Sequence, residues 1–444
     1  MPSAIVVGGG LAGLAAAAAL GSAGFRVELF EARPFLGGRA SSFPRSPGEE
    51  DSELIDNSQH ILLRCCVNLL DFYQRLGVAD QIRFYDQFYF VEPGGRVSVL
   101  RADGLPAPLH FLGSFLSLHF LSPPDKLWVA RGLAALRRER TSRHDLDRLT
   151  MLEWLREKRQ TPRAIQRFWR QILVSAVNEE LDRMAALYGF QVFWLGFLAQ
   201  SSSYEMGLPV VPLGQLYSSR FWERSENIEL HLGSPVERIA IEQQAARGAL
   251  AGGQMRAADY YICAAPFERI GALAPGLELD LAAFEHSPIT GIHLWFDRPV
   301  IDLPHATLLD RTIQWVFNKG QGKYLQLVVS ASRSLLEMSR ADVIARATAE
   351  LAEFFPRVRE ARLEKAQVIK EVRATWSGKP GVEAFRPVSQ TRVGRLFLAG
   401  DWTSTGWPAT MEGAVRSGYL AAEAVTQAAG QPQAFLYPGL RFRH

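Results

Sequence analysis

The first forty residues alternate between short apolar runs and a pattern of small residues. The apolar runs predict strands over 4–7 and 26–31, and the alanine-rich stretch over 11–21 predicts a helix, with three consecutive glycines before it. Strand, helix and strand in this order are typical of a βαβ unit. We therefore expect later segments to complete a parallel sheet that starts here.

Strands of a different kind are predicted further along the chain. Segments rich in β-branched and aromatic residues occur at 84–91, 291–296, 314–317 and 324–330. They do not alternate with helices in the way that parallel strands require, so they indicate a separate antiparallel sheet.

Helical periodicity dominates the region of about 112–199. The clearest predicted helices cover 147–158 and 162–177, and Pro123 with Pro124 predicts a break. We interpret this region as the helical part of a second domain.

Two later regions return to the first pattern. Short strands recur over 228–266, where 260–265 is almost continuously apolar, as in a buried parallel strand, and 396–424 predicts strand, turn and helix. The predicted fold is therefore α/β, with a discontinuous Rossmann-type domain and a second domain of antiparallel sheet plus helices. The first domain is expected over 1–80, 222–285 and 386–430, and the second over 81–221 and 286–385, with its helical part at about 110–200.

Composition narrows the class of protein. Of 444 residues, 48% are hydrophobic and 21% charged, and the net charge is only +3, which argues against disorder and against nucleic-acid binding. Three cysteines, with Cys65 and Cys66 adjacent and no second pair, argue against a disulfide framework and against a metal site. The sequence predicts a reducing, cytoplasmic compartment.

Membrane contact is expected only at a surface. No uninterrupted apolar run is long enough to span a bilayer, and the glycine-broken stretch from Ile5 to Leu20 does not read as a signal peptide.

The first glycines form the pattern G-x-G-x-x-G through Gly8, Gly10 and Gly13, directly after a strand and at the start of a helix. Such glycines allow a tight turn, close approach to a pyrophosphate and close packing of helix on strand. A glycine turn without a ligand is the alternative. Glu31 favours the nucleotide interpretation because it ends the second strand, where a carboxylate accepts hydrogen bonds from ribose hydroxyls.

Two further elements suit a larger dinucleotide. Gly37, Gly38 and Arg39 can direct amides and a guanidinium toward phosphates. Near the other end, Asp401 can meet a ribityl hydroxyl, and the predicted helix start at Met411 can face the pyrimidine edge of a flavin. The sequence therefore predicts FAD; a plain turn followed by a capped helix is the alternative for the last element. The predicted FAD contacts from these elements are Gly8, Gly10, Leu11, Ala12, Gly13, Glu31, Ala32, Gly37, Gly38, Arg39, Gly400, Asp401, Thr410, Met411 and Ala414.

Together these elements resemble the superfamily of amine oxidases and phytoene desaturases. The resemblance covers the whole chain and implies one FAD in a glutathione-reductase-like domain, joined to a substrate domain. It also implies that Val236, between two short strands, lies at the adenine side, although a plain core valine is an equal alternative.

A closer resemblance lies in residues 54–63, which are similar to the squalene-associated branch, the hydroxysqualene dehydroxylases of hopanoid biosynthesis. Ser58 stands where that branch has glycine, and 178–180, 188–190 and 208–213 also look like it. The resemblance implies reduction of hydroxysqualene, a long apolar isoprenoid, to squalene. Hydride from reduced flavin would reach an allylic cation.

The same resemblance implies catalytic roles for Gln59 and His60. His60 is a possible acid for the leaving hydroxyl, a satisfied structural histidine is an equal alternative, and Asp56 is expected to anchor the turn. A helical face of four aromatics offers either a wall for the isoprenoid or ordinary core. These are Phe190, Phe193, Trp194 and Phe197.

An apolar cluster over 111–121 is followed by basic residues over 126–143. Such a wedge suits an anionic bilayer surface and predicts peripheral association with the inner face of the cell membrane; a core helix with a charged face is the alternative. The competing activities are desaturation of a carotenoid precursor, amine oxidation, and non-catalytic binding of FAD or lipid. No second nicotinamide motif is evident, which leaves the electron donor open.

Overall fold

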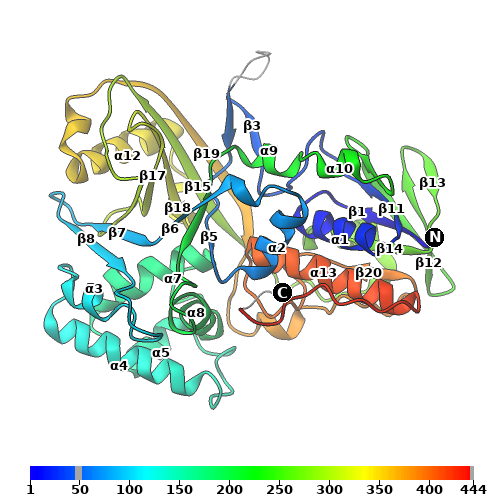
Figure 1. The fold of residues 1–444 in the computed structure, drawn as a ribbon, viewed down its shortest axis with the longest axis horizontal. Helices are drawn as coiled ribbons and strands as arrows, with labels where there is room; N and C mark the ends of the chain where they lie inside the picture. The colour runs from blue at the N-terminus through cyan, green and yellow to red at the C-terminus, as the bar shows by residue number, and fades with distance from the viewer. Residues whose placement is uncertain (46–52, 441–444) are drawn as a thin grey trace.

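The computed structural model describes residues 1–45 and 53–440, and it consists of two domains side by side (Figure 1). The blue, red and part of the green segments, from the start, the end and the middle of the chain, form one domain. The other contains a large sheet and the cyan to green helices.

A five-stranded parallel sheet forms the centre of the first domain. Its order is β10-β2-β1-β14-β20, and its neighbouring strands are all parallel. The strands are β1 (Ser3–Val7), β2 (Arg26–Phe30), β10 (Ile228–His231), β14 (Tyr260–Cys263) and β20 (Leu396–Leu398). The prediction that distant parts of the chain complete one parallel sheet is confirmed.

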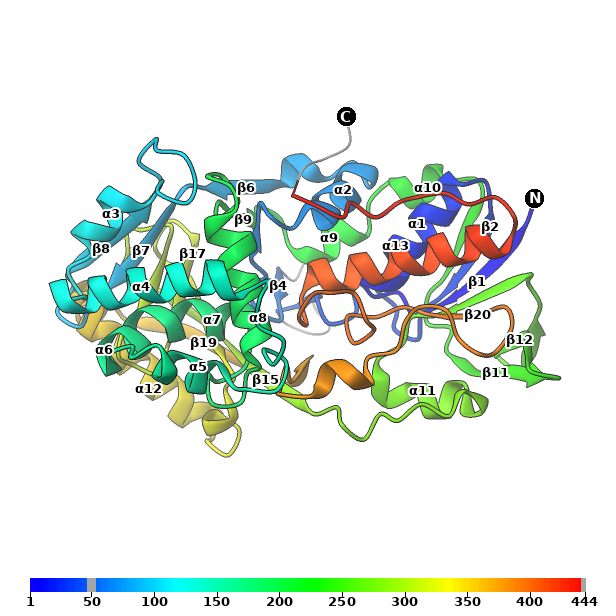
Figure 2. The ribbon, with the colours of Figure 1, turned by 90° about the horizontal axis from the view of Figure 1, so that it is seen from below.

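Two helices pack together against this sheet (Figure 2). They are α1 (Leu11–Ser22) and α13 (Met411–Ala428). Small residues permit the close approach, because a Cβ on Gly418 would lie 2.2 Å from the carbonyl oxygen of Ala12. The antiparallel strands β11 (Val236–Glu242), β12 (Ala245–Ala251) and β13 (Gln254–Arg256), with α11 (Phe267–Leu273), complete the domain.

A seven-stranded sheet forms the second domain, in the order β19-β15-β18-β17-β16-β7-β8. All neighbours are antiparallel except β7 and β16, so the sheet is mixed and not purely antiparallel as predicted. The strands are β7 (Gln87–Val91), β8 (Val97–Arg101), β15 (His286–Phe296), β16 (His305–Leu308), β17 (Trp315–Gly320), β18 (Tyr324–Ser330) and β19 (Leu363–Trp376).

One predicted strand proved to be two. Residues 84–91 divide at Asp86 between β6 (Ile82–Tyr85) and β7, which belong to different sheets. β6 pairs with β9 (Met206–Pro209), which also pairs with β5 (Leu62–Leu63). The pairing partners are distant in sequence, so the division has no local signal.

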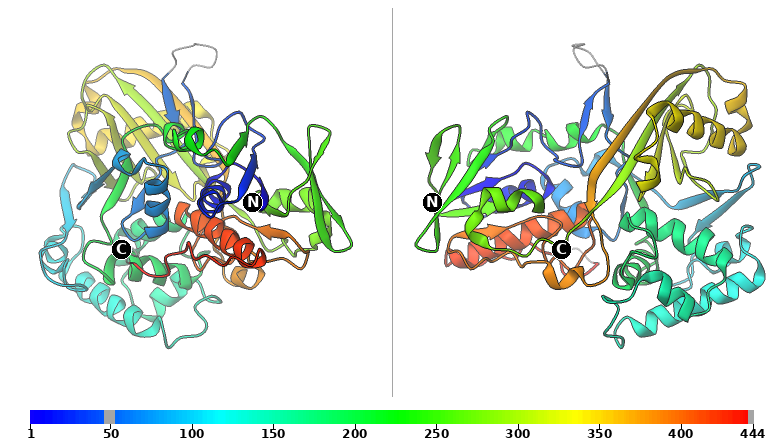
Figure 3. Two further views of the ribbon diagram at one scale, coloured as in Figure 1. Left: turned by 45° about the vertical axis from the view of Figure 1, so that its right-hand side comes forward. Right: turned by 180° about the vertical axis from the view of Figure 1, so that it is seen from behind.

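Helices cover both faces of the seven-stranded sheet (Figure 3). One face packs against α12 (Arg340–Phe354), and the other faces the helical layer. That layer contains α3 (Leu112–Ser117), α4 (Pro123–Glu139), α5 (Met151–Glu157), α6 (Pro162–Ala164), α7 (Arg170–Val177) and α8 (Ala186–Phe193).

The helical region is broken at the predicted prolines, between α3 and α4. Pro123 and Pro124 form the first turn of α4, since proline fits where no backbone donor is needed. One helix prediction requires correction. The predicted helix over 162–177 is interrupted by a π-helical segment, Ile165–Trp169.

The fold also contains five shorter strands and helices. They are β3 (Ser42–Pro44), β4 (Leu54–Asp56), α2 (Val67–Arg75), α9 (Leu213–Tyr217) and α10 (Phe221–Arg224). Of these, α2, α9 and α10 pack into the core of the first domain. Within residues 1–45 and 53–440, no helix is long and apolar enough to cross a membrane.

Candidate functional site: a nucleotide groove and an apolar pocket

The glycine pattern forms the turn between β1 and α1. Gly8 has φ +113°, a conformation that favours glycine, and a Cβ on Gly13 would lie 1.9 Å from the Gly8 carbonyl oxygen. Gly13 therefore allows the first turn of α1 to pack directly on the loop. Leu11 and Ala12 begin this helix, and no side chain caps its amino terminus.

The second glycine pair lies directly beside the first turn. The Gly37 amide donates to the Gly9 carbonyl at 2.9 Å, and a Cβ on Gly38 would lie 3.0 Å from the Gly10 Cα. A Cβ on Gly10 itself would meet nothing closer than the Gly38 Cα at 3.9 Å. The two runs thus present bare backbone at a helix amino terminus, the kind of surface that binds phosphate.

Glu31 lies against the same turn. Its carboxylate accepts hydrogen bonds from the Gly9 amide at 2.6 Å and the Arg33 amide at 2.8 Å, and Ala32 between them is exposed. The Gly233 amide donates to the Arg33 carbonyl at 2.9 Å, which brings the loop before Val236 to this end of the groove. The predicted ribose and adenine residues are therefore neighbours.

The other end of the chain joins the groove through Arg39. Its guanidinium forms an ion pair with the buried carboxylate of Asp401, 362 residues away in sequence. Gly400 has φ +144°, and its amide donates to the Ser417 hydroxyl on α13 at 2.8 Å. This links the acidic turn to the last helix.

α13 begins close to the second domain, since the Gln191 amide on α8 donates to the Gly406 carbonyl shortly before this helix. Thr410 caps the helix by accepting a hydrogen bond from the Gly413 amide at 3.1 Å, and Met411 and Ala414 lie in the first turn. The amino terminus of a helix favours negative charge nearby.

A mostly apolar pocket extends from this helix start into the second domain. Its empty space, including the open mouth, is about 1020 Å³, and it runs from Thr410, Met411 and Glu412 to Phe88, Phe90 and Trp315. About half of its lining residues are Leu, Ile, Val, Phe or Trp, and Cys, Met and Ala add further apolar surface. A pocket of this character fits a large apolar molecule.

Comparison with known proteins defines the family. Residues 11–426 match the family described as flavin containing amine oxidoreductase. The chain belongs to this family. It is accordingly an FAD-dependent oxidoreductase, and the bare groove with its acidic residue, Arg39 and helix start fits that cofactor.

The relatives of this flavoprotein include two carotenoid desaturases of Synechococcus elongatus. The 15-cis-phytoene desaturase is 26% identical, with 95% of each chain covered, and the probable zeta-carotene desaturase is 25% identical, with 95% of this chain and 98% of the relative covered.

Solved structures share the fold. Putrescine oxidase bound to putrescine has a TM-score of 0.70 at 17% identity, covering 96% of this chain and 99% of its own. Cyclohexylamine oxidase from Brevibacterium oxydans has a TM-score of 0.68 at 18% identity, covering 97% and 99%.

The segment predicted to be catalytic lies between the two domains. The Lys319 ammonium on β17 donates to the Gln59 side-chain oxygen at 3.0 Å, and the buried Asp56 carboxylate accepts from the Leu213 amide at 2.9 Å. Asp56 thus anchors the turn as predicted. Ser58 lies outside the positive-φ region, so this turn does not require glycine.

His60 is held by a neighbour in the same turn. Its Nε2 lies 2.9 Å from the Asn57 side-chain oxygen, and burial lowers its pKa to about 4 despite the opposing effect of Asp56. The ring is therefore neutral near pH 7. Neither Gln59 nor His60 lines the apolar pocket, although the next residues, Ile61 to Leu63, do.

The aromatic helical face separates into two roles. Phe197 lines the pocket, whereas Phe190 and Phe193 are buried against Trp154 and Trp169. Trp194 stacks under the Arg140 guanidinium. Core packing thus accounts for most of this face.

The predicted apolar cluster over 111–121 exposes other side chains than expected. Phe120 is buried and Phe115 packs partly buried on Phe168, so these phenylalanines are not the exposed residues. Leucines form the exposed surface instead, with Leu109 56%, Leu112 45% and Leu116 57% exposed. We define the leucine patch as Leu105, Leu109, Leu112, Leu116 and Leu127, all exposed.

Sequence reasoning missed Glu412, which lines the pocket. It is fully buried, accepts hydrogen bonds from the Asn68 side chain at 2.8 Å and the Leu69 amide at 2.7 Å, and so caps α2. Burial raises its pKa. Its position directly after Met411 was the available signal.

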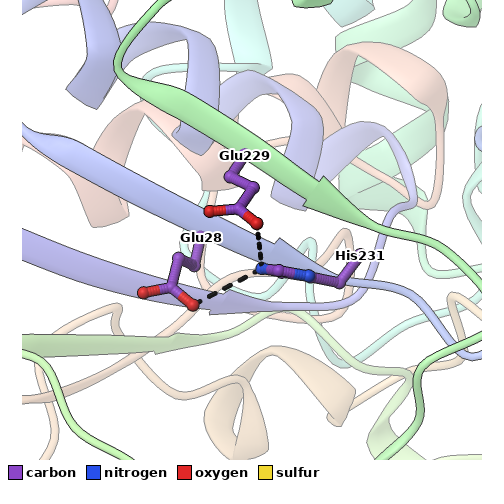
Figure 4. A group of neighbouring side chains, drawn as sticks. All are labelled: Glu28, Glu229 and His231. Carbon is purple, nitrogen blue, oxygen red and sulfur yellow. Dashed lines mark ion pairs between the residues drawn. The ribbon is translucent and has the colours of Figure 1, made fainter.

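One charged group lies apart from the pocket. Glu28, Glu229 and His231 meet on neighbouring strands β2 and β10, with nitrogen–oxygen distances of 3.4 and 3.5 Å (Figure 4). His231 thus lies between the two carboxylates at the edge of the sheet.

Proposed function

We propose that FAD lies along the groove, with its pyrophosphate at the first turn of α1. Glu31 would hold the ribose of the adenosine half, Arg39 and the Gly37–Gly38 backbone would meet the phosphates, and Asp401 would meet the ribityl chain. The amino terminus of α13 would then face the pyrimidine edge of the flavin and favour negative charge there. The support for this assignment is that direct contacts link these elements: the Gly37 amide donates to the Gly9 carbonyl, the Gly9 amide donates to Glu31, and Arg39 pairs with Asp401.

We further propose that the enzyme reduces hydroxysqualene to squalene. In this reaction the carbon–oxygen bond breaks, the hydroxyl takes up a proton and leaves as water, and a hydride forms the new carbon–hydrogen bond. Reduced FAD supplies that hydride. The single observation that carries the proposal is the apolar pocket that begins at Thr410, Met411 and Glu412.

The pocket supports this chemistry because its apolar wall can shield an allylic cation from bulk water. Leu69 and Trp407 stand close to the start of α13, and Phe88 and Phe90 stand on the sheet of the second domain. A long isoprenoid can therefore lie with one part against the flavin and the remainder in the second domain.

His60 fits a positioning role better than that of an acid. A ring with a pKa of about 4 is neutral near pH 7 and is then a poor proton donor. Its contact with Asn57 holds the turn that leads into the pocket wall.

We also propose that the enzyme takes its substrate from a membrane surface through the leucine patch. Leu112 and Leu116 lie one turn apart on α3, and the Lys126 ammonium on α4 donates to the Leu116 carbonyl at 2.5 Å. Phe111, next to Leu112, contacts the pocket-lining Phe197. Exposed leucines beside a basic helix suit an anionic bilayer.

Desaturation of a carotenoid precursor is the second candidate, supported by the names of the desaturases that are 25–26% identical. Anaerobic incubation of the protein with photoreduced FAD and hydroxysqualene separates the two. Formation of squalene supports dehydroxylation. Absence of squalene, with oxidised FAD reduced by a carotenoid precursor, would replace it with desaturation.

A further inference from the structure

Two buried polar atoms on the pocket wall have no hydrogen-bond partner within residues 1–45 and 53–440. They are the side-chain oxygen of Gln171 and the hydroxyl of Thr307, and these residues are only 3% and 1% exposed. Buried polar groups are nearly always hydrogen-bonded, so two unpaired groups in a mostly apolar pocket indicate a missing partner.

The two atoms belong to one small region. Thr307 on β16 is the direct cross-strand neighbour of Trp315 on β17, so both side chains stand on the same face of the sheet. The Trp315 indole donates to the Ser175 hydroxyl at 2.6 Å. That hydroxyl in turn donates to the main-chain carbonyl oxygen of Gln171, one turn earlier on α7. Trp315 and Ser175 therefore connect the strand that carries Thr307 to the helix that carries Gln171.

We propose that Gln171 and Thr307 form a subsite for the hydroxyl group of the substrate. An alcohol can donate to the Gln171 oxygen and accept from the Thr307 hydroxyl, which pairs both groups at once. A hydrocarbon of the same length leaves both unpaired. This inference rests on the proposed function, because it names the feature that distinguishes hydroxysqualene from a hydrocarbon precursor.

The pocket contains a matched control in Gln191. It also lines the wall, but its amide already donates to the Gly406 carbonyl at 2.5 Å. Replacing Gln191 removes a polar side chain from the wall, but the two unpaired atoms of Gln171 and Thr307 remain. Gln191→Leu should therefore leave the preference between alcohol and hydrocarbon unchanged.

Binding is measured on the FAD-loaded, oxidised protein without a reductant, so that no turnover occurs, with hydroxysqualene and squalene in matched detergent. A second pair, farnesol and farnesene, tests alcohol recognition independently of hydroxysqualene. We expect wild type to prefer each alcohol by about tenfold to a hundredfold. Thr307→Val and Gln171→Leu should each reduce that preference by about tenfold.

Thermal unfolding provides the check on folding. Since the Thr307 hydroxyl has no partner, Thr307→Val should be at least as stable as wild type. Lower stability would mean that the hydroxyl is already paired within the protein, and it would overturn the subsite.

The outcomes separate the two proposals. Equal binding of alcohol and hydrocarbon by wild type, or a preference that survives in both variants, overturns the subsite even if hydroxysqualene is converted. A preference for alcohols that both variants lose supports the subsite even if hydroxysqualene is not converted, in which case the proposed reaction fails alone.

Discussion

The two domains position their chemistry by different means. In the nucleotide domain the groove is made of backbone, and it depends on residues such as Gly13 and Gly38 that must lack a side chain. In the second domain the pocket is made of side chains from α7, α8, β7, β16 and β17, and no single stretch of sequence encodes it. Backbone sites therefore leave a local motif, whereas side-chain sites depend on tertiary pairing.

The largest expected effect comes from a substitution of Gly13, because the backbone-built site of the first domain leaves no space there for a side chain. Gly13→Ala places a Cβ 1.9 Å from the Gly8 carbonyl oxygen, so we expect loss of more than about 3 kcal/mol of stability and loss of FAD. Gly271→Ala on α11 is the control, because its Cβ would meet nothing within 4 Å. Stability is measured by chemical denaturation. A Gly13→Ala protein as stable as Gly271→Ala would contradict the described turn.

Gly10→Val separates cofactor binding from folding. The new side chain has room within the protein but fills the bare surface proposed for the pyrophosphate. We expect the purified variant to fold with less than about a tenth of the wild-type FAD, as estimated from a loss of about 1.4 kcal/mol or more in binding. Absorbance at the flavin band and circular dichroism measure the two properties. Full FAD content in Gly10→Val would refute the groove.

The features that these two variants test could be predicted from the sequence. The turn at Gly8 to Gly13 and the position of Glu31 were readable because their backbone geometry and ligand chemistry restrict the residue type. The strand Tyr324–Ser330 was predicted with its observed bounds because its residues strongly favour a strand. None of these required knowledge of distant partners.

The rest of the site depended on distant pairing. The chain divides at Asp86 because β6 pairs with β9 whereas β7 pairs with β16. Lys319 contacts Gln59 although the two residues are 260 positions apart in the sequence. The exposed Leu112 and Leu116 lie in the same apolar run as the buried Leu118 and Phe120, so only packing decides which residues face outward. Gln171 and Thr307 became candidates only when their unpaired atoms were located in one pocket.

A third test concerns the surface of the second domain. Replacing Leu112 and Leu116 by Ser removes two exposed apolar side chains, each worth up to about 1.5–3 kcal/mol when fully buried in lipid, so co-sedimentation with anionic vesicles should fall at least about tenfold. Leu232→Ser with Val388→Ser, also exposed but in the nucleotide domain, is the control. Equal vesicle binding by both double variants would contradict the proposal that the leucine patch binds the membrane.

The buried histidines of the seven-stranded sheet predict a pH dependence of stability. Burial lowers the pKa values of His293 and His305 to about 4, below the value of about 6.5 expected when unfolded. Between these values the unfolded chain binds more protons, so stability should decline by a few kcal/mol as the pH falls from about 6.5 to 4. His305→Gln should flatten this slope in denaturation curves. An unchanged slope would contradict a neutral His305.

The smallest effect is expected at His60. Because its ring is neutral near pH 7, His60→Ala should retain FAD and slow turnover by less than tenfold, whereas loss of a general acid typically costs about a hundredfold or more. Single-turnover rates from pH 6 to 8 provide the measurement. A hundredfold loss with intact FAD would restore His60 as the acid.

The most direct test of the proposed reaction is the fate of hydrogen during conversion of hydroxysqualene. The FAD-loaded protein is photoreduced without oxygen in D₂O, where the flavin N–H exchanges for deuterium, and the product is analysed by mass spectrometry and NMR. We expect squalene with one deuterium at the former carbinol carbon, and water as the other product. Recovery of unchanged hydroxysqualene, or of squalene without deuterium at that carbon, would contradict it.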